Sequence, residues 1–292
     1  MLNGVLIVDK PAGWTSFDVV AKMRGVLGTK KIGHSGTLDP MATGVLPLFV
    51  GPAARAVDMQ QDHTKAYEAK AFFGLRTDTG DITGRVLEEK KVLIEEAAVK
   101  AALPFFVGKQ MQTPPMYSAV KVNGQPLYKL ARKGQEAVRA PRPIEIFSFD
   151  YLRREEENEF WVRVSCSKGT YVRVLIEELG QRLDAPAVLS GLRRIRSGAY
   201  TLEKAHTVDE ICRAKEEGRL KDLLYPVDSV FPQYPAVTVG AACAAALKNG
   251  AKSALALEDG VYRAYFEEGF LGLFEVQCGE AKVKRLFIER EG

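Results

Sequence analysis

The hydrophobic pattern at the start of the chain predicts a buried strand followed by an amphipathic helix. Residues 4–8 form a continuous apolar run rich in β-branched side chains, which is typical of a buried strand. Apolar side chains then recur at helical spacing over residues 17–27. Thr15 and Asp18 have the spacing of a capping box, and Gly28 is placed to end the helix. The chain therefore opens with a strand, a short turn and a helix.

Strands and helices are also predicted along the rest of the chain, from alternating apolar positions and from Ala-rich or helically periodic stretches. The predicted strands lie at residues 45–50, 64–73, 160–166, 261–266, 271–277 and 282–288. The predicted helices lie at residues 53–61, 95–103, 168–183 and 240–249, and residues 207–224 are predicted to be a short charged helix and its exit. The mixture predicts an α+β protein.

A proline-punctuated segment, residues 226–235, indicates a boundary between two domains. We therefore expect a large domain of residues 1–230 and a small, mostly β domain of residues 231–292. A length of 292 residues, 46% of them hydrophobic and 27% charged, is enough for a large core and a second small domain.

The charge and the apolar segments limit the classes of partner. Lys and Arg total 41 against 37 for Asp and Glu, and the net charge of +4 permits a nucleic-acid partner without demanding one. The apolar run at the N-terminus is too short for a signal peptide, and no stretch reaches the length of a membrane span. We expect a soluble, cytoplasmic protein that does not bind a membrane.

Cysteine and histidine spacing argues against a metal site. No two cysteines form a C-x-x-C pair, and the chain has only three histidines, so neither a zinc site nor a His-rich centre is expected. We interpret the cysteines as reduced, buried, small hydrophobic residues of a cytosolic protein. They are Cys166, Cys212, Cys243 and Cys278.

The main candidate site is the loop of residues 33–47, which presents Asp39 among glycines, hydroxyls and one histidine. Glycines allow the backbone to turn or to approach a ligand closely, and Pro40 stiffens the chain after Asp39. The carboxylate is therefore presented from a stiff, irregular loop, where catalytic groups tend to lie. From the residues alone, an ordinary Asp-Pro turn is an equal alternative.

A second candidate region, residues 113–134, interleaves tyrosines with lysines and arginines among turn residues. Bases stack on aromatic side chains and phosphates pair with cations, so this composition suits a looped RNA. The alternative is a mobile loop with solvated charges. Arg142 continues the positive charge, and a cluster at residues 192–198 could face RNA phosphates or solvent. The candidate RNA-binding residues are Lys121, Lys129, Arg132, Arg142, Arg193 and Arg194.

The loop of residues 33–40, Gly-His-Ser-Gly-Thr-Leu-Asp-Pro, resembles the signature loop of the TruB family of bacterial synthases. Ser35 stands where that family often has Thr. The enzymes of that family isomerise a uridine in the T loop of transfer RNA to pseudouridine. The motif is long and ungapped, and other matching stretches lie at Lys10-Pro11, residues 76–81 and residues 168–173. The resemblance extends from about residue 4 to residue 197.

The resemblance implies a role for each of several residues. It makes Asp39 the catalytic nucleophile and Arg173 its partner, holding the carboxylate in a bidentate geometry and keeping it ionised. It places Tyr67 against the target base, where it could handle protons. The residues implied to contact the substrate are His34, Tyr171 and Leu192.

The family also implies a fold and a set of partners. The catalytic domain is expected to contain a mixed, mostly antiparallel sheet of the pseudouridine synthase type with flanking helices. Residues 108–145 would form an insertion that closes over RNA, and the C-terminal domain would be a PUA-like RNA-binding module. The implied partner is the T stem-loop of a tRNA whose target base is flipped out. No cofactor, metal or protein partner is implied, and we expect a monomer.

Two other classes stay open from the sequence. The chain could be an RNA-binding or RNA-folding protein in which catalysis is secondary or lost. It could also be an aspartate-nucleophile hydrolase of the phosphatase kind, which needs a second carboxylate two residues after the nucleophile and a magnesium site. Met41 occupies that position, which counts against the hydrolase. Whether Asp39 attacks C6 of the base or C1′ of the ribose is not decided by the sequence.

Overall fold

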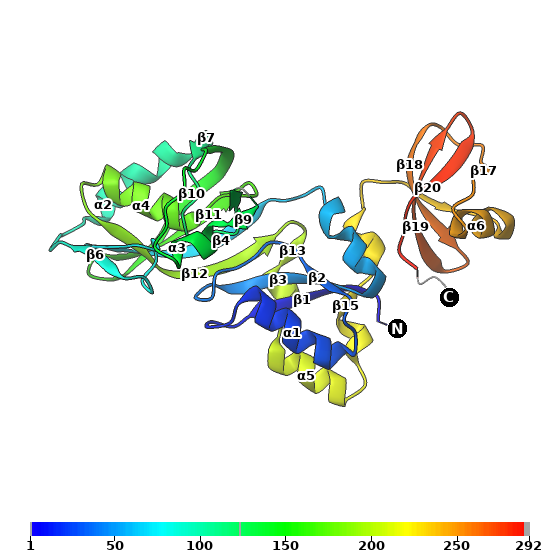
Figure 1. Cartoon of the computed structure of the whole chain (residues 1–292), viewed down its shortest axis with the longest axis horizontal. Coiled ribbons are helices and arrows are strands. Elements are labelled where there is room, and N and C mark those ends of the chain that lie inside the picture. Colours follow the sequence, from blue (N-terminus) through cyan, green and yellow to red (C-terminus); the bar gives the residue numbers. More distant parts are fainter. Residues whose placement is uncertain (1, 123, 289–292) are drawn as a thin grey trace.

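A large mixed sheet organises most of the molecule in the computed structural model, which describes residues 2–122 and 124–288 (Figure 1). Its main path runs β14-β1-β3-β12-β4-β11-β10-β7, with β2, β13 and β15 paired to strands of that path. The strands are β1 (Gly4–Lys10), β2 (Ile32–His34), β3 (Thr43–Val50), β4 (Lys65–Phe73), β7 (Gly108–Gln112), β10 (Arg142–Glu156), β11 (Glu159–Cys166), β12 (Ala187–Ser197), β13 (Tyr200–Thr201), β14 (His206–Thr207) and β15 (Leu224–Tyr225). Among the strand pairs that the structure describes in this sheet, only β1 with β14 and β3 with β12 are parallel, so the expected mixed, mostly antiparallel sheet is confirmed.

Helices cover the two halves of this sheet. Apolar side chains of α1 (Ser16–Leu27) and α5 (Val208–Glu216) share a buried cluster with β1 and β3. On the other half, α2 (Glu96–Ala102) and α4 (Val172–Arg182) pack with β4, β10, β11 and β12. The predicted capping box of α1 is present, and Gly28 ends the helix in the left-handed conformation.

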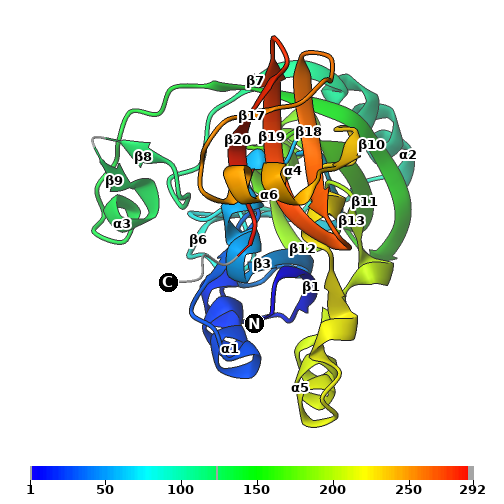
Figure 2. The ribbon, with the colours of Figure 1, turned by 90° about the vertical axis from the view of Figure 1, so that its right-hand side faces the viewer.

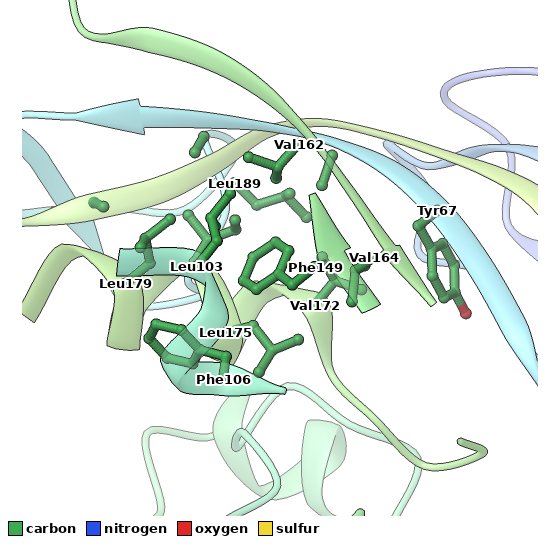
Figure 3. Packing of buried hydrophobic residues seen from close by; sticks show 14 of the residues in the cluster. Tyr67, Leu103, Phe106, Phe149, Val162, Val164, Val172, Leu175, Leu179 and Leu189 are labelled. Carbon is green, nitrogen blue, oxygen red and sulfur yellow. The ribbon is translucent and has the colours of Figure 1, made fainter. Parts of the chain in front are cut away.

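The second half of the sheet has a tightly packed core (Figure 3). Phe73 meets Phe160 edge to face with ring centroids 5.8 Å apart, and Phe106 meets Phe149 at the same distance. Tyr67 lies at one side of this cluster, with its hydroxyl directed away from the apolar side chains (Figure 3). The core therefore supplies a rigid support at the place where Tyr67 leaves the sheet.

The two halves of the sheet are joined by the parallel pairing of β3 with β12. Thr43 is paired with Arg193, and Gly44 with Arg194. Gly44 has φ +99°, and a side-chain carbon built on it would lie 2.2 Å from the carbonyl oxygen of Arg194. Only glycine allows this backbone approach.

A separate five-stranded sheet with one helix lies at one end of the molecule (Figures 1 and 2). Its order is β16-β18-β19-β20-β17. Its elements are β16 (Ala236–Thr238), α6 (Ala241–Lys248), β17 (Ser253–Ala254), β18 (Gly260–Phe266), β19 (Gly269–Gln277) and β20 (Glu280–Leu286). The predicted helix and three predicted strands of this region are confirmed.

Aromatic side chains connect the small sheet to the large one. The ring of Phe287 lies 5.3 Å from that of Phe231 and 5.8 Å from that of Phe270, in a cluster that includes Val5 and Phe49 of the large sheet. Asn3 Nδ2 also donates to the carbonyl oxygen of Phe287 at 2.8 Å. The small sheet is therefore anchored beside β1 and β3.

Two short hairpins leave the large sheet. The first pairs β5 (Leu75–Thr77) with β6 (Val86–Glu89). The second pairs β8 (Lys121–Val122) with β9 (Gln125–Pro126) and continues into α3 (Leu127–Ala131). This second hairpin lies within the predicted insertion.

Three local expectations differ from the structure. Residues 53–61 were expected to be a helix, and Gly51–Met59 is a 3₁₀ helix. Strands β10 and β12 were not predicted, because charged side chains hide their alternation. The expectation of four buried cysteines is wrong for Cys278, which is exposed in the turn before β20, and only in part right for the half-buried Cys212. All four cysteines are free thiols.

Within the part of the chain that the structure describes, no helix is both long and apolar enough to cross a membrane.

Candidate active site

A pocket of about 240 Å³ opens where the two halves of the large sheet meet. Five segments line it: the Asp39 loop, β4, the insertion, the turn before α4, and β12. It brings together five of the predicted site residues, which lie far apart in sequence. They are Asp39, Tyr67, Tyr171, Arg173 and Leu192.

The backbone on either side of Asp39 is fixed by buried polar groups of the N-terminal segment. The hydroxyl of Ser16 accepts from Leu38 N at 2.8 Å and donates to Leu38 O at 3.2 Å. Ser16 is 2% exposed. Ala42 N donates to the carbonyl of Asp39 itself at 3.1 Å, which closes the turn. Sequence reasoning missed Ser16, because nothing in the local sequence links it to a loop 22 residues away.

Lys10 holds the other side of the loop. Its ammonium donates to the carbonyls of Trp14 at 2.5 Å, Pro11 at 2.9 Å and Pro40 at 3.2 Å, and Gly13 N donates to Pro40 O at 2.8 Å. The side chain is fully buried, and burial lowers its pKa to about 8, although the negative charge of Asp39 opposes that change. Lys10 therefore positions the residue that follows Asp39.

Arg173 connects three segments of the site. Its Nε lies 3.1 Å from Asp39 Oδ2, its Nη1 donates to Thr79 O at 2.7 Å, and its Nη2 donates to Tyr117 O at 2.8 Å. Asp81 Oδ2 lies 3.7 Å from Nη1. The guanidinium thus contacts Asp39 through one nitrogen, and the expected bidentate geometry is corrected, because two carbonyls take up the other nitrogens.

Burial and charge act against one another at Asp39. Burial raises the pKa of its carboxyl above the ordinary value, Asp81 adds to the rise, and the positive charges of Arg173 and Lys10 oppose it. The net direction is upward, so burial outweighs the effect of Arg173 that was expected to keep the carboxylate ionised. The side chain is 39% exposed and faces the pocket.

Tyr67 and Tyr171 are held differently. Burial raises the pKa of Tyr67 to about 12, against the opposing charge of Arg194, so its hydroxyl stays protonated near neutral pH. The backbone of Tyr171 is fixed by the buried side chain of Gln112, which accepts from Tyr171 N at 2.8 Å and donates to Tyr171 O at 3.2 Å. Gln112 is a second residue that sequence reasoning missed.

The other predicted residues are distributed around the pocket. His34 ends β2, five residues before Asp39, and is not among the residues that line the pocket. Burial and the charge of Arg194 lower the pKa of His34, which favours the neutral imidazole. Four of the predicted RNA-binding cations have exposed side chains. They are Lys121, Lys129, Arg132 and Arg142.

The two arginines of the cluster on β12 differ from that group. Arg193 is half-buried and pairs with Asp9 at 2.7 Å. Arg194 is fully buried, with Nε donating to Val45 O at 2.7 Å and Nη2 to Gly36 O at 2.9 Å. A guanidinium without exposed surface cannot contact a phosphate, so the prediction that Arg194 binds RNA is corrected.

Among residues 2–122 and 124–288, no group of three or more His, Cys, Asp or Glu side chains is arranged to hold a metal ion. The expectation that the reaction uses no cofactor stays a prediction.

Comparison with known proteins identifies the family. The model of the TruB family pseudouridylate synthase N-terminal domain matches residues 24–172, and that of the tRNA pseudouridylate synthase B C-terminal domain matches residues 173–231. A tRNA pseudouridine synthase B of Lactobacillus delbrueckii is 41% identical over 88% of this chain and 89% of its own. One of Thiobacillus denitrificans is 42% identical over 98% of this chain and 96% of its own.

Solved structures agree with that assignment. A chain of the crystal structure of a Cbf5-Nop10-Gar1 complex superimposes with a TM-score of 0.72 and 26% identity, covering 99% of this chain and 86% of that one. The match extends over both sheets, because it covers nearly the whole chain. From its sequence and its fold, the chain belongs to the TruB family of pseudouridylate synthases.

Proposed function

We propose that this protein isomerises a uridine in the T loop of tRNA to pseudouridine, with Asp39 as the nucleophile. The observation that carries the proposal is the Asp39 carboxylate, which faces a pocket while Arg173 Nε contacts it at 3.1 Å. The names of the relatives support tRNA as the substrate. The signature loop supports Asp39 as the reacting group.

The reaction breaks two bonds and makes two. The N1–C1′ bond breaks, the base turns and C5 bonds to C1′, and the proton that leaves C5 is balanced by a proton taken up at N1. Asp39 would assist by adding either to C6 of the ring or to C1′ of the ribose, and both routes need the ionised carboxylate. No oxidation state changes and no phosphate ester is cleaved, so neither a redox cofactor nor a phosphoryl-transfer metal is required.

The target base must leave its stack to reach Asp39, at a cost of a few kcal/mol. Tyr67 and Leu192 form apolar walls of the pocket on neighbouring strands and would enclose the flipped base. Because Tyr67 stays protonated near neutral pH, its hydroxyl would donate a hydrogen bond or relay a proton, not act as a phenolate. Tyr171 would contact the nucleotide, and His34 would contact RNA beside the pocket.

RNA binding outside the pocket would offset the cost of base flipping. We assign this role to the exposed cations of residues 108–145 and to residues 231–292, taken as a PUA-like domain of a monomeric enzyme. In that domain, Lys282, Lys284 and Arg285 are exposed along β20. Contacts of this kind with phosphates are strongly salt-dependent.

The test is tritium release from a T-arm transcript labelled at uracil C5, comparing the wild type with Asp39→Asn in EDTA. We expect release by the wild type only, with RNA affinity similar for the two proteins. The variant removes the nucleophile but keeps the shape of the side chain. Near-wild-type turnover by Asp39→Asn would remove Asp39 from its role. If both proteins bind the RNA and neither releases tritium, the T-loop substrate is wrong.

A further inference from the structure

Two cationic side chains converge on Gly36, three residues before Asp39. A side-chain carbon built on Gly36 would lie 3.0 Å from Lys65 Cε, 3.5 Å from Lys65 Nζ and 3.2 Å from Arg194 Nη1. Gly36 has φ +75°, so its backbone conformation also favours glycine. The absent side chain leaves room for both cations at the wall of the pocket.

Neither cation is neutralised where they meet. Arg194 is fully buried, two of its nitrogens donate to backbone carbonyls, its guanidinium interacts with the Tyr67 hydroxyl, and no carboxylate of the described residues pairs with it. Lys65 has no carboxylate within ion-pair distance in the described parts of the chain. Burial, with Arg194 and Lys168, lowers the pKa of Lys65, and Cys166 and Asp62 oppose that change. A buried arginine beside a half-buried lysine, both without anionic partners, is a costly arrangement, so a functional reason is expected.

The strand geometry directs Lys65 toward the reacting nucleotide. Lys65 and Tyr67 are two residues apart on β4, so both side chains leave the same face of the sheet. Both line the pocket that contains Asp39. A base lying against Tyr67 would therefore present one of its edges to Lys65.

We propose that Lys65 binds a carbonyl oxygen of the flipped uracil and stabilises the negative charge that develops there as the N1–C1′ bond breaks. The proposal rests on the proposed function, because it assigns a further catalytic residue to the same reaction. Arg194 is a positioning residue, which holds the Gly36 backbone and adds positive potential behind Lys65.

The electron balance explains why a cation is useful at this place. When the N1–C1′ bond breaks, its electron pair enters the ring and is shared by N1, O2 and O4. When C5 attacks C1′, a ring pair forms the new bond, and loss of the C5 proton with uptake of a proton at N1 restores the aromatic system. The ring therefore carries negative charge only between the two steps. A donor placed at the oxygen stabilises that state selectively.

An RNA phosphate is the competing ligand, and the location favours the base. Lys65 lines the pocket beside Tyr67 and Leu192, whereas the exposed cations predicted to bind phosphates lie outside it, at Lys121, Lys129, Arg132 and Arg142. The two ligands also predict different kinetics. A phosphate is charged before and during the reaction, so losing its partner weakens RNA binding. Uracil becomes charged only during the reaction, so losing its partner slows the chemical step.

The test compares Lys65→Met with wild type in single-turnover tritium release and in RNA binding by filter retention. Lys100→Met is the matched control, because Lys100 is exposed on α2, outside the pocket, and pairs with Glu96. We expect Lys65→Met to lose about 10²-fold in rate, the loss typical for one donor to a developing oxyanion. Its RNA dissociation constant should stay within about threefold of the wild-type value.

A second substrate separates charge stabilisation from a structural effect. In 5-fluorouridine, fluorine withdraws electrons and stabilises the ring anion without help. The rate loss of Lys65→Met should therefore be smaller when consumption of a 5-fluorouridine nucleotide is followed by chromatography of nuclease digests. Lys65→Arg keeps the charge and should recover part of the rate. Thermal unfolding of each variant is measured in parallel.

Three results would overturn the proposal. The first is a wild-type rate for Lys65→Met. The second is an unchanged rate with weaker binding and a salt slope reduced by about 0.7–0.9, which identifies a phosphate contact. The third is an equal rate loss on both substrates with no recovery by Lys65→Arg, which identifies a structural role. In each case the comparison of wild type with Asp39→Asn still reports separately on the proposed function.

Discussion

The Asp39 loop and the insertion face the same pocket, but the protein supports them in different ways. The loop is held by buried donors and acceptors from Lys10, Ser16 and Arg173. The hairpin of the insertion makes most of its hydrogen bonds within itself, for example from Leu127 N to Val120 O at 2.8 Å. Its lysines and arginines are exposed.

The difference shows that the loop positions the nucleophile, whereas the insertion is suited to binding RNA. A nucleophile must be held close to the reacting geometry, since a displacement of about 1 Å can cost about 10²-fold in rate. A surface that binds RNA phosphates tolerates more variation, because its contacts are electrostatic and reach farther. We therefore expect substitutions around the loop to change the rate and those in the insertion to change affinity.

The largest of the remaining effects is expected at Arg173. Arg173→Lys keeps the charge but cannot reach Asp39, Thr79 O and Tyr117 O together, so the single-turnover rate should fall by about 10²-fold or more. Arg173→Gln also removes the charge that opposes the raised pKa of Asp39. Without that charge the pKa of Asp39 rises further, so the ionised, active carboxylate forms only at higher pH. The acid limb of the kcat/KM profile of Arg173→Gln should therefore move to higher pH.

Two outcomes would contradict this view of Arg173. One is a rate for Arg173→Lys within a few-fold of wild type. The other is an acid limb of Arg173→Gln that stays in place or moves to lower pH, which would mean that the limb does not report on Asp39.

A smaller effect is expected at Ser16, which tests the rigid support of the loop. Ser16→Ala leaves buried Leu38 backbone groups without their partner, so stability should fall by about 1–3 kcal/mol. The rate should fall about tenfold if the loss of these hydrogen bonds lets the loop shift by less than about 1 Å. Ser229→Ala is the control, since it removes an exposed hydrogen bond and should change stability by less than about 0.5 kcal/mol.

Chemical denaturation and single-turnover kinetics measure the two consequences for Ser16→Ala. Equal stability losses for this variant and Ser229→Ala would contradict the claim that the loop is specially supported.

The smallest effect on the chemical step is expected from the insertion. Lys129→Ala with Arg132→Ala should weaken RNA binding and lower the salt slope by about 0.7–0.9 for each phosphate that the variant no longer neutralises. The rate at saturating RNA should fall far less than the affinity. Titrations at several salt concentrations, with Lys100→Ala as control, measure both. A large fall in rate at saturating RNA would place the insertion in the chemistry and erase the contrast with the loop.

The sequence predicted the elements whose signals are local. The helix that begins at Ser16 carries its own capping box, and β4 shows its alternation directly. Asp39 was found because the whole loop is one contiguous motif. Its partner Arg173 lies in a distant segment, and the resemblance, not the spacing, linked the two.

The rest depends on contacts between distant segments. The charged side chains of β12 suggested a solvated basic cluster, yet Arg194 points to the buried face of a strand. Its partners, Val45 O and Gly36 O, are 149 and 158 residues away in sequence. Ser16 and Gln112 were missed for the same reason, because a buried polar residue cannot be recognised until its partner is known.

The parallel pairing of β3 with β12 has a consequence for folding during synthesis on the ribosome. It joins Thr43 to Arg193, so the first residues of the strand that follows the Asp39 loop lack their partner until some 150 further residues have been synthesised. Contacts with such large sequence separation form slowly during folding. An unfinished chain on the ribosome would carry the complete signature loop and still lack the wall formed by Leu192. The enzyme therefore cannot become active before β12 has emerged and docked.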